Sequence, residues 1–503
     1  MPRARSIMVQ GTMSNAGKSV LVAGLCRIFK QDGYSVAPFK SQNMALNSGV
    51  TADGLEMGRA QVMQAQACGI EPEVGMNPVL LKPESDRGSQ IIVEGKPVAT
   101  MQATEYYRYK GRLKAGIQHA YDDLAERFDI VCIEGAGSPS EINLRQDDFV
   151  NMGLAHMVKS PVLLAGNIDP GGVFAQLYGT YELLDEADRS LVKGFVVNKF
   201  RGDVGILKPG LVDLERLCGV PVLGVVPVMP LDLDDEDSLS QRLEASRGGS
   251  GLLDVAVLRL PRLSNFTDFN QLQRHPLINL RYVQEARELG RPDLVILPGT
   301  KSTMADLVSL RERGLDACVR ALAETGALVI GVCGGYQMLG QRLLDPQGVE
   351  GGGEAEGLGL LPCETTFAGD KSLTRDVGHL DLAPSSAFAP LGALALTGYE
   401  IHMGRTNLAP GAVTDGCVRA GDQRCVGYVA QNVLGTYLHG FFDADGVADA
   451  LVNLMLARRG LPGVAAMSEP YEAYRERQFD LLADGLRNAL DMEAVYRILE
   501  EGV

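Results

Sequence analysis

The stretch Gly11–Ser19 (GTMSNAGKS) decides how the first half of the chain folds, because it has the composition of a phosphate-binding loop. The apolar run Ser6–Gln10, which is expected to form a strand, leads into it, and the helix-forming run Val20–Leu25 follows. Glycines let such a loop turn its backbone N–H groups inward, and the following helix N-terminus adds positive potential where phosphates bind. In this context Lys18 is expected to contact the β- and γ-phosphates, and the hydroxyl of Ser19 is expected to bind Mg²⁺.

The spacing of the loop is unusual, since five residues separate Gly11 from Gly17 where the common pattern has four. The simpler interpretation is an ordinary strand-to-helix turn, but Gly-Lys-Ser between a strand and a helix is a fairly specific pattern. The sequence therefore predicts an ATP site. The loop residues expected to contact the nucleotide are Gly11, Thr12, Asn15, Ala16, Gly17, Lys18 and Ser19.

The composition is that of a soluble globular protein, and its scattered cysteines beside an ATP site predict a cytoplasmic one. The chain has 503 residues, 46% of them hydrophobic, which suggests roughly two to four domains. Its net charge of −16 argues against a non-specific nucleic-acid binder but permits a small anionic substrate. We find no signal-peptide pattern and no apolar run long enough to span a bilayer. The nine cysteines are scattered without a CxxC pair, which predicts reduced thiols and not disulfides or a zinc site.

Apolar, β-branched runs alternate with helical periodicity over residues 1 to about 230. Such runs predict strands that are buried on both faces, and therefore a mainly parallel, doubly wound α/β sheet. Ligands of these sheets bind at the carboxyl ends of the strands. Lys40, Glu134, Asn198 and Lys199 each follow or end one of the runs, so we expect them near the loop. Lys40, Asn198 and Lys199 are predicted nucleotide contacts, Asn198 through a base edge.

Three oxygen-bearing side chains are predicted to hold Mg²⁺, namely Ser19, Asp53 and Glu134. Glu134 ends an apolar run, where a carboxylate is costly unless it has a task such as binding a metal ion or its water. The alternative for Glu134 is the N-cap of the next helix. Asp53 precedes Gly54, and a solvated turn aspartate is nearly as good an interpretation of that residue.

An acidic run followed by glycine and serine interrupts the α/β pattern at residues 231–250 and is typical of a linker. A second α/β pattern begins after it. The sequence thus predicts two doubly wound domains, with boundaries at 1–232 for the phosphate-loop domain, 233–251 for the linker, 252–450 for the second domain and 451–503 for a helical extension.

Cys333 is the predicted nucleophile of the second domain. It follows the apolar run Leu328–Val332 and precedes two glycines, which is the arrangement of a nucleophile elbow with a thiol in place of the serine. A helix N-terminus stabilises a thiolate at this position. The alternative is a buried structural cysteine. The neighbouring run ends at Pro298–Gly299, which could supply N–H groups to an oxyanion.

A catalytic cysteine needs a base, and His439 is better placed than its rival His402. His439 follows the strand-like run Val433–Leu438, late in its domain. His402 lies earlier, in a glycine-bounded stretch that also contains Glu400, and a contact with substrate is the alternative role for it. We therefore expect a ring nitrogen of His439 within hydrogen-bond reach of Cys333.

Taken together, these motifs resemble the cobyric acid synthase family, the glutamine-dependent amidases of cobalamin biosynthesis. The resemblance covers nearly the whole chain. Its first half resembles the dethiobiotin synthetase group of phosphate-loop enzymes, and its second half resembles class I glutamine amidotransferases. Besides the loop, the resemblance rests on Gln42–Asn47, Asn77–Pro83, Glu134–Pro139, Asp148–Gly153, Asn198–Gly202, Val332–Gln337, Gly398–Gly404 and Tyr437–Gly440.

The resemblance implies a two-site reaction. Cys333 would attack the side-chain amide of L-glutamine, form a thioester and release ammonia, with His439 shuttling the proton. ATP with Mg²⁺ would phosphorylate a peripheral carboxylate of a corrinoid, and ammonia would displace the phosphate. The implied substrate is adenosylcobyrinic acid a,c-diamide, amidated at its b, d, e and g carboxylates.

The chain departs from the class I pattern after the histidine, which is usually followed by Pro-Glu. Here Gly440 and Phe441 follow His439, so a dyad, or a carboxylate from elsewhere such as Glu400, remains open. The alternative functions are cobyrinate a,c-diamide synthase, an amidotransferase of another polycarboxylate, and a MinD-like switch ATPase. Such switches usually carry an extra lysine early in the loop, where Thr12–Ser14 has none, and have no use for Cys333.

Overall fold

The computed structural model describes residues 4–83, 88–233, 251–467 and 469–503, and the chain divides into two compact units. The first unit comprises Met1–Ala45, Leu55–Asp234 and Arg475–Val503, and the second comprises Leu46–Gly54 and Asp235–Tyr474. The predicted linker at 233–251 lies outside the described residues except for its two ends. The units cross the predicted boundaries at two places, because the last helices join the first unit and a short early segment joins the second.

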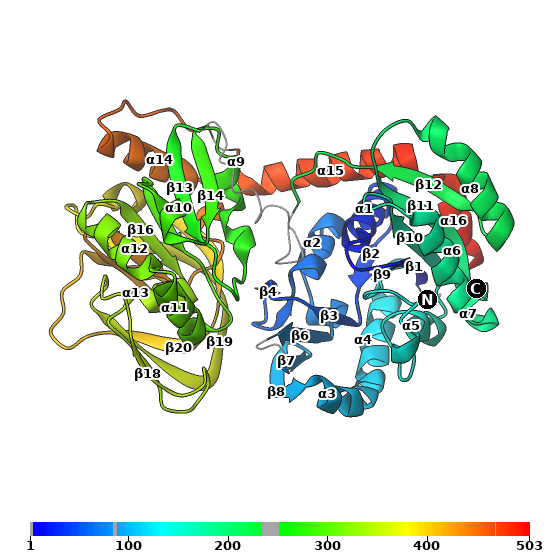
Figure 1. The fold of residues 1–503 in the computed structure, drawn as a ribbon, viewed down its shortest axis with the longest axis horizontal. Helices are drawn as coiled ribbons and strands as arrows, with labels where there is room; N and C mark the ends of the chain where they lie inside the picture. The colour runs from blue at the N-terminus through cyan, green and yellow to red at the C-terminus, as the bar shows by residue number, and fades with distance from the viewer. Residues whose placement is uncertain (1–3, 84–87, 234–250, 468) are drawn as a thin grey trace. The chain divides into compact units, whose positions relative to one another are not determined.

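A parallel sheet forms the centre of the first unit, in the strand order β12-β11-β10-β1-β9-β2 (Figure 1). Every neighbouring pair in it is parallel, and β1 is buried along its length after its first residue. The predicted doubly wound α/β architecture is confirmed. The strands are β1 (Arg5–Gly11), β2 (Val36–Phe39), β9 (Ile130–Glu134), β10 (Val162–Asn167), β11 (Val192–Phe200) and β12 (Val222–Pro227).

Helices and a smaller sheet complete the N-terminal part of the first unit. The helices are α1 (Lys18–Gln31), α2 (Arg59–Cys68), α3 (Ala103–Tyr109), α4 (Lys114–Arg127), α5 (Met152–Val158), α6 (Val173–Leu183), α7 (Glu186–Leu191) and α8 (Val204–Cys218). The smaller sheet has the order β3-β6-β7-β8, with β3 (Gln42–Met44), β6 (Val79–Pro83), β7 (Gly88–Val93) and β8 (Lys96–Gln102); β5 (Glu56–Gly58) is separate from it.

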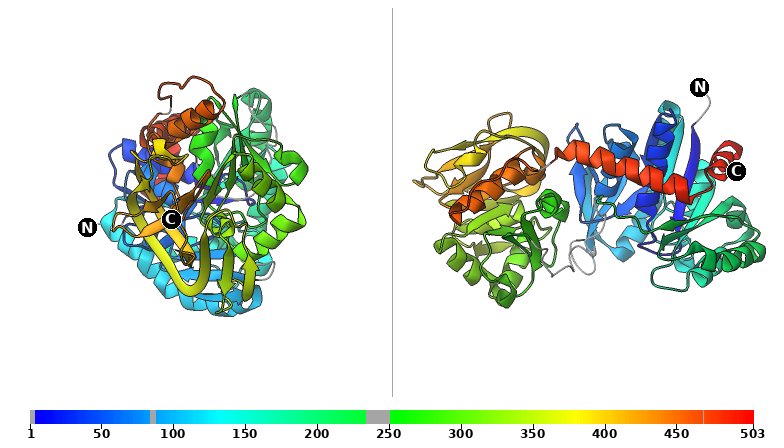
Figure 2. Two further views of the ribbon diagram at one scale, coloured as in Figure 1. Left: turned by 90° about the vertical axis from the view of Figure 1, so that its left-hand side faces the viewer. Right: turned by 90° about the horizontal axis from the view of Figure 1, so that it is seen from above.

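The end of the chain belongs to the first unit from Arg475 onward. This part comprises most of α15 (Tyr471–Ala489) and all of α16 (Met492–Glu501). Figure 2 shows these red helices beside the blue N-terminal segments. Arg27 of α1 donates to Asp480 and Glu476, each at 2.8 Å, and the Phe29 ring meets the Tyr496 ring edge-on at 5.4 Å. The predicted extension is thus not one element, since α14 (Val447–Arg458) belongs to the second unit.

The second unit is built on a longer mixed sheet. Its parallel part has the order β14-β13-β15-β16-β23, formed by β13 (Leu253–Leu258), β14 (Ile278–Val283), β15 (Leu294–Leu297), β16 (Leu328–Val332) and β23 (Val433–Thr436). From β23 the sheet continues through β22 (Cys425–Ala430), β21 (Gly416–Arg419), β19 (Cys363–Leu382), β17 (Arg342–Asp345) and β18 (Gly353–Glu356), and β20 (Ala395–Leu408) pairs with β19.

The parallel part agrees with the predicted doubly wound domain. The continuation adds to it and is antiparallel except for the parallel pair β17–β19. The segment at residues 46–54 contributes β4 (Ser48–Val50) to this unit. Its remaining helices are α9 (Asn270–Arg274), α10 (Ala286–Leu289), α11 (Thr303–Glu312), α12 (Leu315–Glu324) and α13 (Gly334–Leu339). Among the described residues of both units, no helix is long and apolar enough to cross a bilayer.

Candidate functional sites

The phosphate loop joins β1 to α1, and Asn198 braces it from the end of β11. The Nδ2 of Asn198 donates to the carbonyl oxygen of Ala16 at 2.8 Å, and its Oδ1 accepts from the backbone N–H of Lys199 at 2.9 Å. Gly17 has a φ of +84°, and a Cβ added there would overlap the Asn198 amide. Only glycine suits this position. Asn198 and Lys199 therefore lie at the loop as expected. The base-edge contact of Asn198 stays a prediction, because Nδ2 has a second hydrogen besides the one given to Ala16.

Lys18 is buried and lies across the loop. Its Nζ donates to the carbonyl oxygens of Met13, at 3.2 Å, and Gly137, at 3.1 Å. A phosphate oxygen carries negative charge and a carbonyl oxygen does not, so the ammonium is attracted more strongly to phosphate. A bound nucleotide can therefore draw Lys18 away from these two carbonyls.

Glu134, at the end of β9, is the centre of a buried polar cluster and is 1% exposed. Its Oε1 accepts from the Ser19 hydroxyl and from Lys40 Nζ, each at 2.8 Å. Its Oε2 accepts from the amides of Gln64, at 2.6 Å, and Gln61, at 3.3 Å. The structure thus brings Ser19, Lys40 and Glu134 together, as their positions after the strands predict.

The sequence analysis missed the two glutamines of this cluster. Gln61 and Gln64 stand three residues apart on α2, so they share one face of the helix. Both are fully buried. The available signal was the pair of glutamines at this spacing in the helical stretch 59–68, which also contains Arg59 and Gln66.

The cluster fits a magnesium ion that is held together with a nucleotide. Mg²⁺ prefers oxygen ligands and is usually bound by one or two protein groups plus substrate phosphates, which suits the Ser19 hydroxyl and the Glu134 carboxylate. Across the described ranges, no group of three or more His, Cys, Asp or Glu side chains could hold a metal by itself. Asp53 belongs to the second unit and accepts a hydrogen bond from the Thr51 hydroxyl in its own turn, so its role as a metal ligand stays a prediction.

Cys333 occupies a strained turn between β16 and α13. Its φ of +50° and ψ of −108° are unusual for a residue with a side chain, and such strain costs on the order of 1–3 kcal/mol. A Cβ added at Gly335 would overlap the carbonyl oxygen of Leu297 on the neighbouring strand, so the turn needs a glycine there. This is the geometry of a nucleophile elbow.

His439 lies close enough to Cys333 for the thiol to influence its pKa, and Asp268 holds the ring from behind. The Cys333 thiol itself donates to the Ile401 carbonyl oxygen at 3.6 Å. Its Nδ1 donates to Asp268 Oδ2 at 2.7 Å, and the other Asp268 oxygen accepts from the backbone N–H of Gly440 at 3.0 Å. Because Nδ1 is taken, Nε2 is the ring nitrogen left for the thiol. Burial alone would lower the pKa of His439, but the charge and hydrogen bond of Asp268, with a smaller effect of Cys333, raise this pKa to about 10.

Asp268 fills the orienting position that the sequence left open. It lies in a one-turn helix, Phe266–Phe269, and is 3% exposed. It precedes His439 by 171 residues, so the usual adjacent pattern could not reveal it. The available signal was a lone acid between large apolar residues, since a buried carboxylate is costly unless it is paired.

Glu400 does not orient His439, and His402 makes contacts of its own. Glu400 Oε2 lies 3.1 Å from His402 Nε2, and its Oε1 accepts from Arg424 at 2.9 Å. Burial alone would raise the pKa of Glu400, but the His402 hydrogen bond and the nearby positive charges lower it to about 2. The other ring nitrogen of His402 lies 2.7 Å from the Gly404 carbonyl oxygen. Both ring nitrogens of His402 are therefore used within its own strand.

The backbone after β15 lies against the Cys333 turn, where an oxyanion would form. A Cβ placed on Gly299 would stand 3.0 Å from His439 Cε1, and one placed on Gly334 would stand 3.1 Å from the Thr300 nitrogen. Backbone N–H groups at such a position stabilise the negative oxygen of a tetrahedral intermediate. The contribution of Pro298–Gly299 stays a prediction, and the Thr300 N–H is a further candidate beside it.

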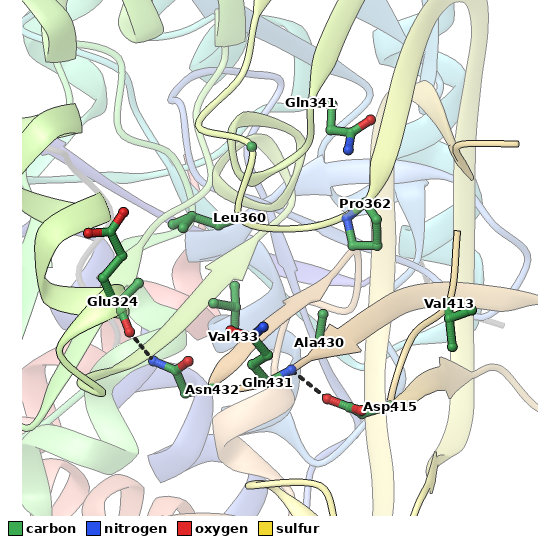
Figure 3. A pocket seen from close by; sticks show the side chains of 12 residues that line it. Glu324, Gln341, Leu360, Pro362, Val413, Asp415, Ala430, Gln431, Asn432 and Val433 are labelled. Atoms are coloured by element: carbon green, nitrogen blue, oxygen red, sulfur yellow. Dashed lines mark hydrogen bonds between the residues drawn. The ribbon is translucent and has the colours of Figure 1, made fainter. Parts of the chain in front are cut away.

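A separate pocket of about 430 Å³ in the second unit includes neither Cys333 nor His439 (Figure 3). Two of its polar groups are engaged by the chain itself. The Asn432 amide donates to the Ala323 carbonyl oxygen at 2.9 Å, and the Gln431 backbone N–H donates to Asp415. We assign the chemistry to the Cys333 turn.

Asp268→Asn is expected to lower the turnover of glutamine by on the order of 10²–10⁴, because the imidazole loses the partner that fixes its tautomer. The folded pKa of His439 lies above the ordinary value of 6.5, so the stabilisation from this pair is complete below that pH and is lost as pH rises toward about 10. Asp268→Asn should therefore be less stable than the parent mainly below about pH 10, with the full difference below pH 6.5. Above about pH 10 the two proteins should have similar free energies of unfolding. Unfolding by urea at several pH values, together with glutamine hydrolysis rates, checks both expectations; an unchanged rate would contradict the role of Asp268.

Comparison with known proteins places the two halves in separate domain families. Residues 7–241 match the CobQ/CobB/MinD/ParA nucleotide binding domain, and residues 254–447 match the CobB/CobQ-like glutamine amidotransferase domain. The chain is 53% identical to the cobyric acid synthase of Ruminiclostridium cellulolyticum over 99% of this chain and 98% of that one. Identity is 49% to that of Lachnoclostridium phytofermentans (99% and 100% covered) and 48% to that of Yersinia enterocolitica (99% and 98% covered). With this identity over the full length of both chains, the protein belongs to the cobyric acid synthase family.

Proposed function

We propose that this chain amidates the b, d, e and g carboxylates of adenosylcobyrinic acid a,c-diamide in cobalamin biosynthesis, using ATP and L-glutamine. The observation that carries the proposal is the Cys333–His439–Asp268 centre on the same chain as a phosphate loop whose serine bonds Glu134. Either site alone fits many enzymes, but an ammonia source and a phosphoryl-transfer site on one chain suit an amidoligase. The need for ATP and for a reduced cysteine favours the cytoplasm as its location.

In the glutaminase centre, the Cys333 thiolate attacks the side-chain amide carbon of glutamine. The oxygen becomes negative in the tetrahedral intermediate and is stabilised by backbone N–H groups of Gly334 and Thr300. Protonated His439 then gives its proton to the leaving nitrogen, and ammonia departs. Asp268 stabilises the charged imidazole throughout, and water later hydrolyses the thioester with His439 as its base.

In the synthetase centre, the carboxylate of the corrinoid is a poor acyl donor, because oxide would have to leave. Transfer of the γ-phosphoryl group of ATP to it creates a good leaving group, which ammonia then displaces. Lys18 stabilises the charge on the transferring phosphoryl group, and Ser19 and Glu134 would hold Mg²⁺. When bound, Mg²⁺ supplies further neutralisation of the phosphate charge.

The direct test incubates the purified protein with ATP, glutamine and either cobyrinic acid or its adenosylated a,c-diamide, and counts the amides gained by mass spectrometry. The proposal predicts amides at the b, d, e and g positions of the a,c-diamide. Reaction of cobyrinic acid alone, stopping at the a and c positions, would indicate a cobyrinate a,c-diamide synthase. ATP hydrolysis without any amide gain would favour a switch ATPase.

A further inference from the structure

A short segment that precedes most of the nucleotide-binding domain in sequence folds into the glutaminase unit. Residues 46–54 fall within the stretch 7–241 that matches the nucleotide-binding family, yet Leu46–Gly54 belongs to the second unit. Asn47 and Ser48 are completely buried there. Polar residues so deeply buried are normally hydrogen-bonded, and the groups they bond lie around His439.

The first of these groups is Asn265, which is held by both residues. The Oδ1 of Asn47 accepts from the backbone N–H of Asn265 at 2.8 Å, and the backbone N–H of Ser48 donates to Asn265 Oδ1 at 3.1 Å. The second bond turns the Asn265 Nδ2 toward His439, where it lies 3.5 Å from Nε2. Asn265 has a φ of +53° and begins the helical turn that carries Asp268, so its conformation also affects the orienting carboxylate.

The second group is Tyr399, which lies on the face of the His439 ring. The two rings stack with centroids 5.3 Å apart and an interplanar angle of 21°. Their backbones exchange hydrogen bonds of 3.1 and 2.9 Å, and the Tyr399 hydroxyl donates to the carbonyl oxygen of Ser48 at 3.1 Å. Ser48 is thus bonded to both of the residues that flank His439.

We propose that Asn47 and Ser48 are positioning residues of the glutaminase centre, which is therefore assembled from both family domains and not from the amidotransferase domain alone. The proposal rests on the proposed function of Cys333 and His439 in glutamine hydrolysis. Asn47 touches neither thiol nor imidazole in this scheme; it acts by fixing the Asn265 turn. Without its oxygen, the buried N–H of Asn265 loses its acceptor, which favours a different turn conformation.

The test compares full-length Asn47→Ala with the parent in two assays, glutamine hydrolysis and amidation driven by ammonium. A displacement of about 1 Å at a catalytic group can cost about 10²-fold in rate, so we expect kcat for glutamine hydrolysis to fall on the order of 10–100-fold. KM for glutamine should change little, because Asn47 acts on the base and not on the bound amide. Ammonium-driven amidation should stay within about twofold of the parent, since it bypasses the glutaminase centre.

Three further variants sharpen the test. Tyr399→Phe removes only the hydroxyl that bonds Ser48, and it should lower kcat less than Asn47→Ala does. The double variant should lose less activity than the two single losses predict when they are added as activation free energies. Asn47→Asp keeps an acceptor oxygen and should recover part of the lost rate. Ala52→Ser, at an exposed position of the same segment, should match the parent.

Parent-like kcat in both Asn47→Ala and Tyr399→Phe would overturn the proposal. So would an equal loss of both activities in soluble Asn47→Ala, because that pattern indicates a general structural role. If Asn47→Ala does not fold, Tyr399→Phe decides alone, with unchanged kcat as the contrary result. If the parent itself does not hydrolyse glutamine, the proposed function fails instead, and the two failures are thus distinguishable.

Discussion

Cys333→Ser is expected to abolish amidation from glutamine while amidation from high ammonium continues. Only the glutaminase step needs a thiolate, and a serine hydroxyl at the same turn is a far weaker nucleophile at neutral pH. The strained backbone at Cys333 and its closeness to His439 have no evident value for the synthetase chemistry. Both rates are measured on the same corrinoid substrate with ATP present, so that the nitrogen source alone differs.

Cys363→Ser is a suitable control for this prediction, because Cys363 is also buried in the second unit but lies at the start of β19. It should keep the use of glutamine. Full glutamine-dependent activity in purified Cys333→Ser would show that Cys333 is a structural cysteine.

Glu134→Gln and Lys18→Ala are expected to remove amidation from glutamine and from ammonium alike, by on the order of 10²–10⁴ in kcat. Either change disables carboxylate activation, which both nitrogen sources need. Glu134→Gln is a cleaner substitution than Glu134→Ala, because the new side chain keeps the size and one acceptor oxygen of the original. It still removes the charge that faces Lys40, which is only 5% exposed and 2.8 Å away.

Glutamine hydrolysis by these variants is the control, because it does not require the phosphate-loop site. Glutamine hydrolysis should survive in Glu134→Gln, which distinguishes a lost phosphoryl-transfer site from a misfolded chain. Titration with Mg²⁺ then separates a metal role from a packing role. A parent-like rate of ammonium-driven amidation at limiting Mg²⁺ would contradict the assignment of Glu134.

A site can be predicted from the sequence when one short stretch contains both the strand end or turn and the reactive residue. The stretch Gly11–Ser19 contains the end of a strand, the glycines of the loop and the lysine that is predicted to contact phosphate. Cys333 likewise carries a strand end and two glycines beside it. Glu134 could be predicted because a carboxylate at the end of an apolar strand is costly without a partner.

The missed residues depend on contacts between segments that are far apart in the chain. Asp268 reaches His439 across 171 residues, and Asn47 reaches Asn265 across 218. No local periodicity encodes such pairs. Asp53 shows the converse, since Asp-Gly suits a turn as well as a ligand, and the bond from the Thr51 hydroxyl is compatible with either role.

The assignment of the C-terminal helices to the first unit depends on such distant contacts as well. The helical pattern after residue 466 is visible in the sequence. The apolar face of an amphipathic helix, however, does not indicate against which hydrophobic core the helix packs. Phe479, Leu482 and Leu486 fill the hydrophobic core around α1 in the first unit, a choice fixed only by packing.

The most direct measurement of the central claim uses glutamine labelled with ¹⁵N in its side-chain amide. The protein is incubated with this glutamine, ATP and adenosylcobyrinic acid a,c-diamide, and the corrinoid product is analysed by mass spectrometry. The account predicts labelled amides at the b, d, e and g positions, and their absence when ATP is omitted or Cys333→Ser is used. A product without new amides, or one whose new amides carry no label, would contradict it.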